Sequence, residues 1–279
     1  LGEQAEMSFG NKPVDGGHLL LSRAEVDALG LSAAQRQRFI RRIYGSAEFI
    51  RGQERYCLWI ADEHLAEAQS IPAIAARIAG VRKMRLDSRD SGANAMAERA
   101  HQLREMNIGQ THAIAMPCVS SESRDYLPVG LLDANSTVTN LAYALYDAPL
   151  WNLALIASRL HLVWIATVCG KLKTDFRYSN TLGWNTFPLP TLTAKQKADL
   201  TASAEHILLA RETHFPATIA ELYAADAMPA NLRAAHDAND ELIERIYIGR
   251  RFKNDSERLE KLFALYTEMV AKPAKRKRV

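Results

Sequence analysis

The residues best suited to chemistry stand between Cys169 and Asn180, directly after a long apolar stretch. If this segment is extended, its alternating charged side chains point to one face. They are Lys171, Lys173, Asp175 and Arg177. Lysine and arginine donate hydrogen bonds to guanine O6 and N7, and aspartate accepts one from cytosine N4. The spacing predicts a strand that can distinguish base pairs; the alternative is a surface strand with self-paired charges.

Polar side chains near this segment add to the same interpretation. Tyr178, Ser179 and Asn180 follow the charged run and could reach phosphates or bases. A second polar segment, residues 120–128, offers short polar groups and Glu122 at the turn between two expected strands. The alternative for that loop is an ordinary solvated turn.

Arginine gathers in two short regions and outnumbers lysine in both. The first region holds Arg36, Arg38, Arg41, Arg42, Arg51 and Arg55. The second holds Arg77, Arg82, Lys83, Arg85 and Arg89. A forked guanidinium suits phosphate or carboxylate. The alternative is a solvated face whose charges pair with Glu48, Glu54, Asp87 and Asp90.

The net charge of +3 is unevenly distributed. Residues 272–279 carry five Lys and Arg, residues 191–271 hold 10 against 13 Asp and Glu, and residues 1–190 hold 20 against 19. The body of the chain is therefore not globally basic, and bulk charge alone does not indicate a nucleic-acid binder. We expect residues 272–279 to be a disordered basic tail.

The cysteines and one long apolar segment argue against disulfide-rich, zinc-binding and membrane-spanning proteins. The three cysteines, Cys57, Cys118 and Cys169, lie far apart and show no CxxC spacing, so we expect neither a disulfide framework nor a zinc site. This cysteine usage predicts a location in the reducing cytoplasm. Residues 150–170 are long and apolar, but they contain Asn152 and Arg159. A central arginine is costly in a bilayer, so we expect a buried core helix and no membrane partner.

The opening residues show no signal peptide and no initial methionine, which suggests a piece of a longer chain. No phosphate-binding glycine loop, GxSxG elbow or HExxH pattern is present. The Asn/Asp/Ser-Pro-Pro-aromatic loop by which an amino-methyltransferase grips a base is also absent. We therefore expect no catalytic, metal or cofactor-binding residue, and interpret His161 as a core residue.

Hydrophobic periodicity and turn residues predict an α+β chain. Strands are expected at 18–21, 55–60, 113–119, 126–131 and 137–146, and helices at 22–28, 32–44, 71–81, 94–106 and 150–168. Four further helices are expected at 193–213, 218–224, 231–248 and 255–271. This pattern divides the chain into a mixed α/β domain at 1–190, a helical bundle at 191–271 and the tail at 272–279.

Several sequence blocks stand in order along the first domain. They include FGNKPVDGGHL at 9–19, FIRR at 39–42, RYCLW at 55–59, SSE at 120–122, GKLKTDFRYSN at 170–180 and NTFP at 185–188. The ordered set resembles the target recognition domain of MmeI-like (type IIL) single-chain restriction–modification enzymes. The helical end is similar to the C-terminal domain of that family.

The resemblance implies a parent adenine-N6 DNA methyltransferase that uses S-adenosylmethionine, from a family whose full-length members also carry an endonuclease. Its Asn-Pro-Pro-Tyr loop and cofactor motif lie upstream of the first block in the family, so catalysis carries over to no residue here. The implied partners are double-stranded DNA and the upstream methyltransferase domain. By resemblance, the base-reading residues are Lys173, Asp175, Arg177, Asn140, Leu141 and, more weakly, Glu122. We assign to the DNA backbone Lys171, Tyr178, Ser179, Asn180, Arg41 and Arg42.

Two other functions stay open. One is a protein–protein scaffold or regulatory domain that uses the helical end, whose acidic balance does not favour DNA. The other is a hydrolase built on the loop from Asp15 to His18 with Asp87 or Asp175. The hydrolase lacks any recognisable nucleophile motif. DNA binding that weakens steeply with salt would separate the recognition module from both.

Overall fold

The computed structural model describes residues 3–271, and the expected basic tail lies outside them. The chain forms two compact units, each described by itself below. The sheet unit comprises Phe9–Ala115 and Leu131–Asp147. The hairpin unit comprises Leu1–Ser8, Met116–Gly130 and Ala148–Val279. Helices and sheets occur together in both units, so the expected α+β class is confirmed.

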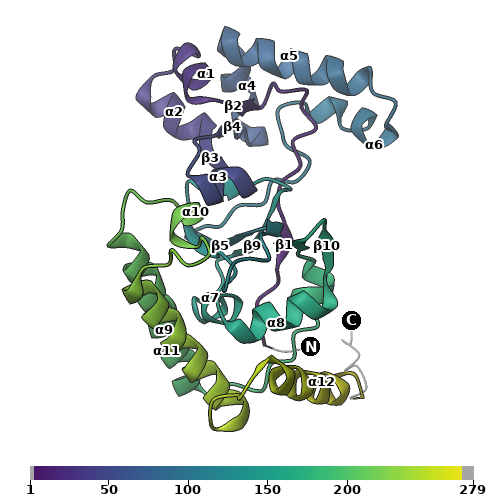
Figure 1. Ribbon diagram of the computed structural model, residues 1–279. Helices are drawn as coiled ribbons and strands as arrows, with labels where there is room; N and C mark the ends of the chain where they lie inside the picture. Colours follow the sequence, from purple (N-terminus) through teal and green to yellow (C-terminus); the bar gives the residue numbers. More distant parts are fainter. Residues whose placement is uncertain (1–2, 272–279) are drawn as a thin grey trace. The chain divides into compact units, whose positions relative to one another are not determined.

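The sheet unit contains one four-stranded sheet and the larger part of another (Figure 1). The first has the order β2 (Leu20–Leu21), β4 (Tyr56–Leu58), β3 (Ile40–Tyr44) and β8 (Ser136–Val138). Its pairs are antiparallel except β3 with β8, which is parallel. The second sheet has the order β1 (Ser8–Phe9), β9 (Ala142–Tyr146), β5 (His112–Pro117) and β7 (Gly130–Asp133).

Helices and short helical turns cover the first sheet. They are α1 (Arg23–Ala28), α2 (Ala33–Phe39), α3 (Ser46–Arg51), η1 (Asp62–His64), α4 (Leu65–Ser70), α5 (Pro72–Leu86), α6 (Ser91–Asn94) and η2 (Ala97–Arg99). α1 begins at the expected capping box, in which the side chains of Ser22 and Glu25 each accept the other residue's backbone N–H. The core packs Leu19, Phe39 and Ile43 with helix residues such as Ile74.

The expected helix at 32–44 is wrong beyond Phe39, where the chain turns into β3. Ile40 and Ile43 are both buried, and β3 pairs with β4 on one side and β8 on the other. β-Branched side chains suit such a central strand. Pairing with strands distant in sequence therefore overrides the local helical pattern.

The expected helix at 94–106 is also wrong, because only short turns form there. The cause is Arg85, which is fully buried on α5 in line with Ile78 and Val81. Its guanidinium donates to the carbonyls of Met96, Arg99 and Gln102 at 2.7–2.9 Å. Carbonyls that would otherwise accept bonds within a helix are thus used by an arginine of another element.

The single strand expected at 137–146 is two strands, β8 and β9, joined by residues 139–141. Asn11 lies against this connection. Its Nδ2 donates to Thr137 Oγ1 at 2.8 Å and to the Val138 carbonyl at 3.1 Å. Its carbonyl accepts the Asn140 N–H at 3.1 Å. A buried amide from the start of the chain therefore ends β8.

The hairpin unit combines a three-stranded sheet with helices (Figure 1). The sheet has the order β10 (Gly170–Leu172), β11 (Asp175–Arg177) and β6 (Val119–Ser120), all antiparallel. The helices are α7 (Trp151–Ile156), α8 (Arg159–Val168), the π-helical turn η3 (Asn180–Trp184), α9 (Ala194–Glu212), α10 (Ile219–Leu222), α11 (Ala230–Ile248) and α12 (Asp255–Ala271).

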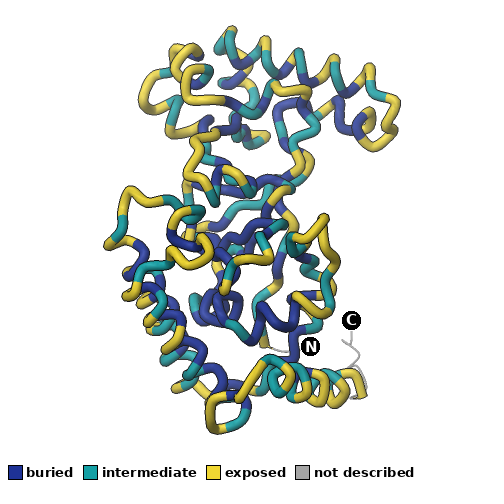
Figure 2. The backbone as a smooth tube through the Cα atoms, viewed as in Figure 1, coloured by how far each residue is buried: buried dark blue, intermediate teal, exposed yellow. Residues whose placement is uncertain are grey.

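The long buried helix expected at 150–168 is broken at Ser158 into α7 and α8. Ser158 Oγ accepts the His161 N–H at 3.1 Å and donates to the Leu155 carbonyl at 2.7 Å. Both helices remain largely buried, as Figure 2 shows. No helix among residues 3–271 is long and apolar enough to cross a bilayer.

The four helices expected after residue 191 are all present, and α9 begins at a capping box formed by Thr193 and Gln196. They share a core with α7 and α8. Asn239 of α11 donates to the Ala154 carbonyl at 2.9 Å. Buried His236 stacks on Tyr126, with 4.1 Å between the ring centroids. The compact unit therefore continues across the expected boundary at 190, and the division into two domains remains a prediction.

Replacing Arg85 with alanine should strongly destabilise the protein. The change leaves several buried carbonyls without donors, and each buried unsatisfied group costs about 1–3 kcal/mol. We expect the free energy of unfolding, measured with urea, to fall by more than about 3 kcal/mol. Arg82→Ala, one turn earlier on the same helix, should cost under about 1 kcal/mol because Arg82 is exposed. Equal losses would contradict the role of Arg85.

Limited proteolysis should cut the chain between Pro188 and Thr193. Thr191 is exposed there, and no regular structure protects the backbone. Because α9 packs on α7, the two fragments should remain together during size-exclusion chromatography. Mass spectrometry locates the cut. Dissociation of the fragments would show that residues 191–271 fold as an independent domain.

Candidate nucleic-acid interface

The charged segment 170–177 is a β-hairpin and not the single extended strand that its spacing predicted. Its register pairs Gly170 with Arg177, Lys171 with Phe176, and Leu172 with Asp175. Lys173 and Thr174 form the turn, and Lys173 adopts the left-handed backbone conformation at φ 57°. Lys173 and Asp175 are therefore not neighbours on one face of a strand, contrary to the expectation from their spacing.

Cross-strand partners in an antiparallel pair share a face. One face of the hairpin, the Asp175 face, carries Leu172, Asp175 and Arg177. The opposite face, the Phe176 face, carries Lys171 and Phe176, with Lys171 Nζ 5.7 Å from the ring centroid. Asp175 and Arg177 thus stand together as expected, while Lys171 lies on the other side.

The Phe176 face is directed toward α8. Phe176 lines a hollow of about 280 Å³ together with Leu162 and Val163 of that helix. Lys171 Nζ lies 2.9 Å from a carboxylate oxygen of Glu122. The alternative of self-paired charges therefore applies to Lys171 and Glu122, which must separate before either binds DNA.

The Asp175 face and the turn carry uncommitted charges. Among residues 3–271, no side-chain hydrogen bond or ion pair joins Lys173, Asp175 or Arg177 to another residue. Lys173 and Arg177 are exposed, and Asp175 is half-buried. Burial lowers the pKa of nearby Arg124, and the charge of Asp175 opposes that shift. Free donors and a free acceptor at one hairpin tip are suited to base edges.

The residues after β11 hold the hairpin in place. Tyr178 is buried, its N–H donates to the Cys118 carbonyl at 2.9 Å, and its hydroxyl lies 3.0 Å from His161 Nε2. Ser179 caps η3 by accepting the Leu182 N–H. Asn180 Nδ2 donates to the Met7 carbonyl at 2.9 Å. Tyr178, which was expected to contact the DNA backbone, is buried in the core, and that contact stays a prediction.

In the sheet unit, Asn140 and Leu141 occupy the connection between β8 and β9. The Leu141 N–H donates to Thr139 Oγ1 at 3.1 Å, and its carbonyl accepts Ser46 Oγ at 2.6 Å. These bonds fix the loop, while the Leu141 side chain is 56% exposed. The backbone of the loop is therefore held in place, while the apolar side chain of Leu141 stays exposed.

Arg41 and Arg42 lie on β3 and line a hollow of about 520 Å³. The Arg42 guanidinium lies 5.4 Å from the Tyr44 ring and 3.5 Å from a Glu54 oxygen. Arg41 donates to its own neighbour's carbonyl, that of Ile40, at 3.0 Å. Other arginines of this region also pair with acids. Arg55 pairs with Glu48, as the alternative predicted, whereas Arg36 pairs with Asp27 and Arg38 with Glu67, which it did not name.

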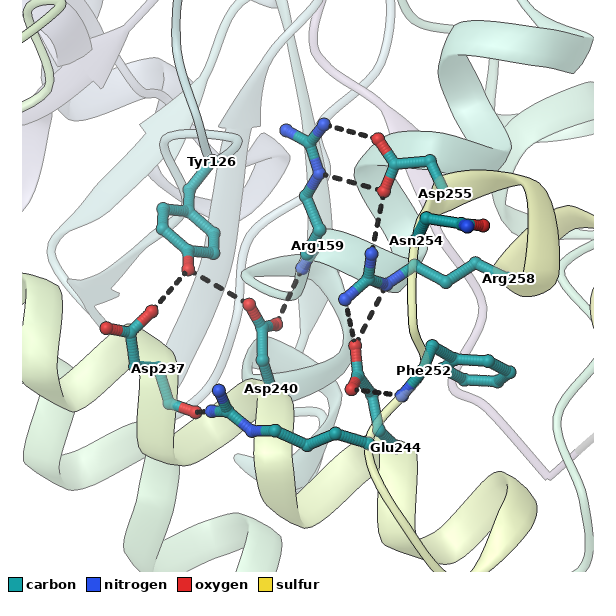
Figure 3. A pocket seen from close by; sticks show the side chains of 10 residues that line it. Tyr126, Arg159, Asp237, Asp240, Glu244, Phe252, Asn254, Asp255 and Arg258 are labelled. Atoms are coloured by element: carbon teal, nitrogen blue, oxygen red, sulfur yellow. Dashed lines mark hydrogen bonds and ion pairs between the residues drawn. The ribbon is translucent and has the colours of Figure 1, made fainter.

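A further polar cluster in the hairpin unit was missed by sequence reasoning (Figure 3). Tyr126 Oη donates to Asp240 at 2.9 Å, and the Arg159 N–H donates to the other oxygen of Asp240 at 2.7 Å. Glu244 and Asp255 both accept from Arg258. Burial raises the pKa of Asp240 to about 6. Asp237, Asp240 and Glu244 are spaced three and four residues apart, so they lie on one face of α11. This spacing is the sequence pattern from which the cluster could have been predicted.

This cluster lines a hollow of about 440 Å³, but its charges satisfy one another. It joins α8, α11 and α12 through ion pairs and hydrogen bonds. Among residues 3–271, no group of three His, Cys, Asp or Glu side chains is placed to hold a metal ion. The cluster therefore serves to hold helices together.

Comparisons with known proteins identify the class of the chain. Residues 1–191 match the family model "MmeI, target recognition domain", and residues 192–273 match "MmeI, C-terminal domain". DNA methyltransferase A of Bacillus subtilis (strain 168) is 39% identical over 265 residues, which are 95% of this chain and 30% of that protein. The chain thus consists of a recognition domain joined to a C-terminal domain.

A solved structure has the same fold over nearly the whole chain. It is the type IIL restriction–modification enzyme MmeI in complex with DNA, with a TM-score of 0.90 and 29% identity. The match covers 97% of this chain and 36% of that one, so the chain spans about a third of its relatives' length. The chain belongs to the MmeI family.

Buried His161 should make stability fall with acidification. Burial lowers its pKa from 6.5 to about 3. The unfolded chain binds a proton at His161 below about pH 6.5, and the folded chain does not. The contribution of neutral His161 to the free energy of unfolding is therefore full above that pH and is lost toward pH 3. We expect His161→Gln to lose less unfolding free energy than the wild type between pH 6.5 and 4.5.

Exposed His206 on α9 gives the matched control. His206→Gln should keep the wild-type dependence on pH. Part of the dependence of the unfolding free energy on pH will remain in every variant, because burial also lowers the pKa of His236 to about 3. Denaturant titrations at each pH measure the slopes. Identical slopes for the wild type and His161→Gln would mean that His161 is charged in the folded protein.

Proposed function

We propose that this chain reads the DNA sequence for a larger adenine-N6 methyltransferase. The observation that carries the proposal is the tip of the β10–β11 hairpin, where the side chains of Lys173, Asp175 and Arg177 form no hydrogen bond or ion pair with any other residue between 3 and 271. Membership of a target-recognition family supports the same function. Unpaired charges on an anchored hairpin are suited to a duplex groove, which admits a two-stranded β-ribbon.

Lys173 and Asp175 are proposed to specify one G·C base pair. Lys173 is donor-only and suits guanine O6 and N7, whereas Asp175 is acceptor-only and suits cytosine N4. The turn sets Lys173 at the tip, and Asp175 is the first residue of β11. Arg177 follows on the Asp175 face and is proposed to contact a neighbouring base or phosphate.

The remaining candidates have secondary roles in the proposal. Asn140 and Leu141 are proposed to read bases from the sheet unit, because their loop is fixed and Leu141 is exposed. Phosphate contacts are proposed for the cations and small polar side chains Lys171, Ser179, Asn180, Arg41 and Arg42. Glu122 remains a weaker base-reading candidate, since it is paired with Lys171.

The rest of the activity is proposed for the longer protein that the relatives' lengths imply. S-adenosylmethionine would bind an upstream methyltransferase domain, which would extract the adenine that it modifies. No residue of this chain is assigned to that chemistry. Double-stranded DNA and the methyltransferase domain are the proposed partners, and the cytoplasm is the proposed location.

The competing function is a scaffold that acts through the acidic helical end. Salt separates the two, since DNA binding releases counterions and weakens steeply between 50 and 200 mM salt. A mobility-shift titration of the 279-residue chain on duplex DNA measures this dependence. Little binding at any salt concentration would favour the scaffold.

Lys173→Ala and Asp175→Ala should each relax the preference at one base pair. Loss of a specific contact removes about 1–3 kcal/mol of discrimination at that position and little elsewhere. Binding to a library of duplex sites measures the preference at every position. Lys171→Ala is the matched control, because this lysine belongs to the same hairpin but lies on the Phe176 face.

Lys171→Ala should weaken binding to all duplex sequences about equally. It should also reduce the slope of the logarithm of the binding constant against the logarithm of the salt concentration by about one. Neither Lys173→Ala nor Asp175→Ala should alter folding, since neither side chain forms a hydrogen bond or ion pair with another residue between 3 and 271. If the double alanine variant also weakened every sequence equally, the two residues would position phosphates, and the base-reading assignment would be wrong.

A further inference from the structure

Leu172 is an exposed apolar residue at the tip of the hairpin. Its side chain is 51% exposed, and it is the last residue of β10 before the turn. The register pairs it with Asp175, so the two side chains share a face. A leucine here contributes little to the core of its own chain.

The surroundings of Leu172 on this face are open. Gly170, two residues earlier on the same face, has no atom within 4 Å of the position that a Cβ would take. The protein therefore places a half-exposed apolar side chain beside the charges of Asp175 and Arg177, with open space next to it at Gly170. In contrast, Phe176 on the opposite face lies over a hollow lined by α8.

Base edges in a duplex offer one apolar group in the major groove, the C5-methyl of thymine. Directly paired residues of a hairpin have Cβ atoms about 4.5–5.5 Å apart, while successive base pairs are about 3.4 Å apart. The two side chains are thus separated by between one and two base-pair steps, which leaves the base pair beside the one that Asp175 reads within reach of a leucine side chain.

We propose that Leu172 is a specificity-determining residue that contacts the C5-methyl of a thymine. This thymine belongs to the base pair next to the G·C pair of Lys173 and Asp175. The inference rests on the proposed function, since it requires the Asp175 face to lie in the major groove. It adds an apolar contact to a site otherwise built from charges.

Deoxyuridine tests the contact, because it differs from thymidine only by the missing methyl group. The 279-residue chain is first used to select its preferred duplex from a random library. Each thymine of that duplex is then replaced singly with deoxyuridine, and the dissociation constants are compared. Wild-type chain should lose about fourfold in affinity at one position, the effect of exposing one methyl group.

Leu172→Ala should bind the thymine and deoxyuridine duplexes at that position with equal affinity. Leu209→Ala is the matched control, because Leu209 is 60% exposed on α9 of the same unit. This control should keep the fourfold preference. Matching thermal unfolding curves for both variants would show that folding is unchanged.

Two results would overturn the inference alone. One is a wild-type chain that selects a sequence but shows no position sensitive to deoxyuridine. The other is Leu172→Ala retaining the same sensitivity, or weakening every duplex equally as a wedge between base steps would. If the wild-type chain selects no sequence at all, the proposed function itself fails, and the inference fails with it.

Discussion

The pairing of Leu172 with Asp175 is the constraint on which the candidate interface depends. Side chains alternate between the faces of a strand, so a slip of one residue would exchange the two faces of the hairpin. The present register leaves Asp175 and Arg177 together and turns Phe176 toward α8. The left-handed turn at Lys173 fixes that register from one end.

The other end of the hairpin is fixed by buried contacts. Ser158 starts α8, α8 carries His161, and His161 Nε2 lies 3.0 Å from the Tyr178 hydroxyl directly after β11. The Tyr178 N–H also donates to the Cys118 carbonyl, next to β6. A chain of polar contacts inside the core thus holds a surface element, and each unmade bond would carry a desolvation cost. The exposed charges are therefore displayed on a rigid support.

Local signals in the sequence predicted much of this fold. The helices that begin at capping residues, such as Ser22 and Thr193, start where the sequence indicated. The errors arise where distant residues compete for backbone groups. Arg85 takes the carbonyls that a helix at 94–106 would have used, and Asn11 ends β8 from the start of the chain. Such long-range bonds leave no periodic trace near the segment that they reshape.

The same limit applies to the candidate site. Alternation correctly placed Asp175 with Arg177, because both lie on β11, but it could not locate the turn at Lys173. The residues of the hairpin divide by their contacts. Tyr178 is held in the core, so replacing it would cost stability, whereas the side chains of Lys173 and Asp175 form no hydrogen bond or ion pair in the part of the chain that the structure describes. Substitutions at those two positions are therefore expected to leave the fold intact, so that any change in base preference can be attributed to the two side chains themselves.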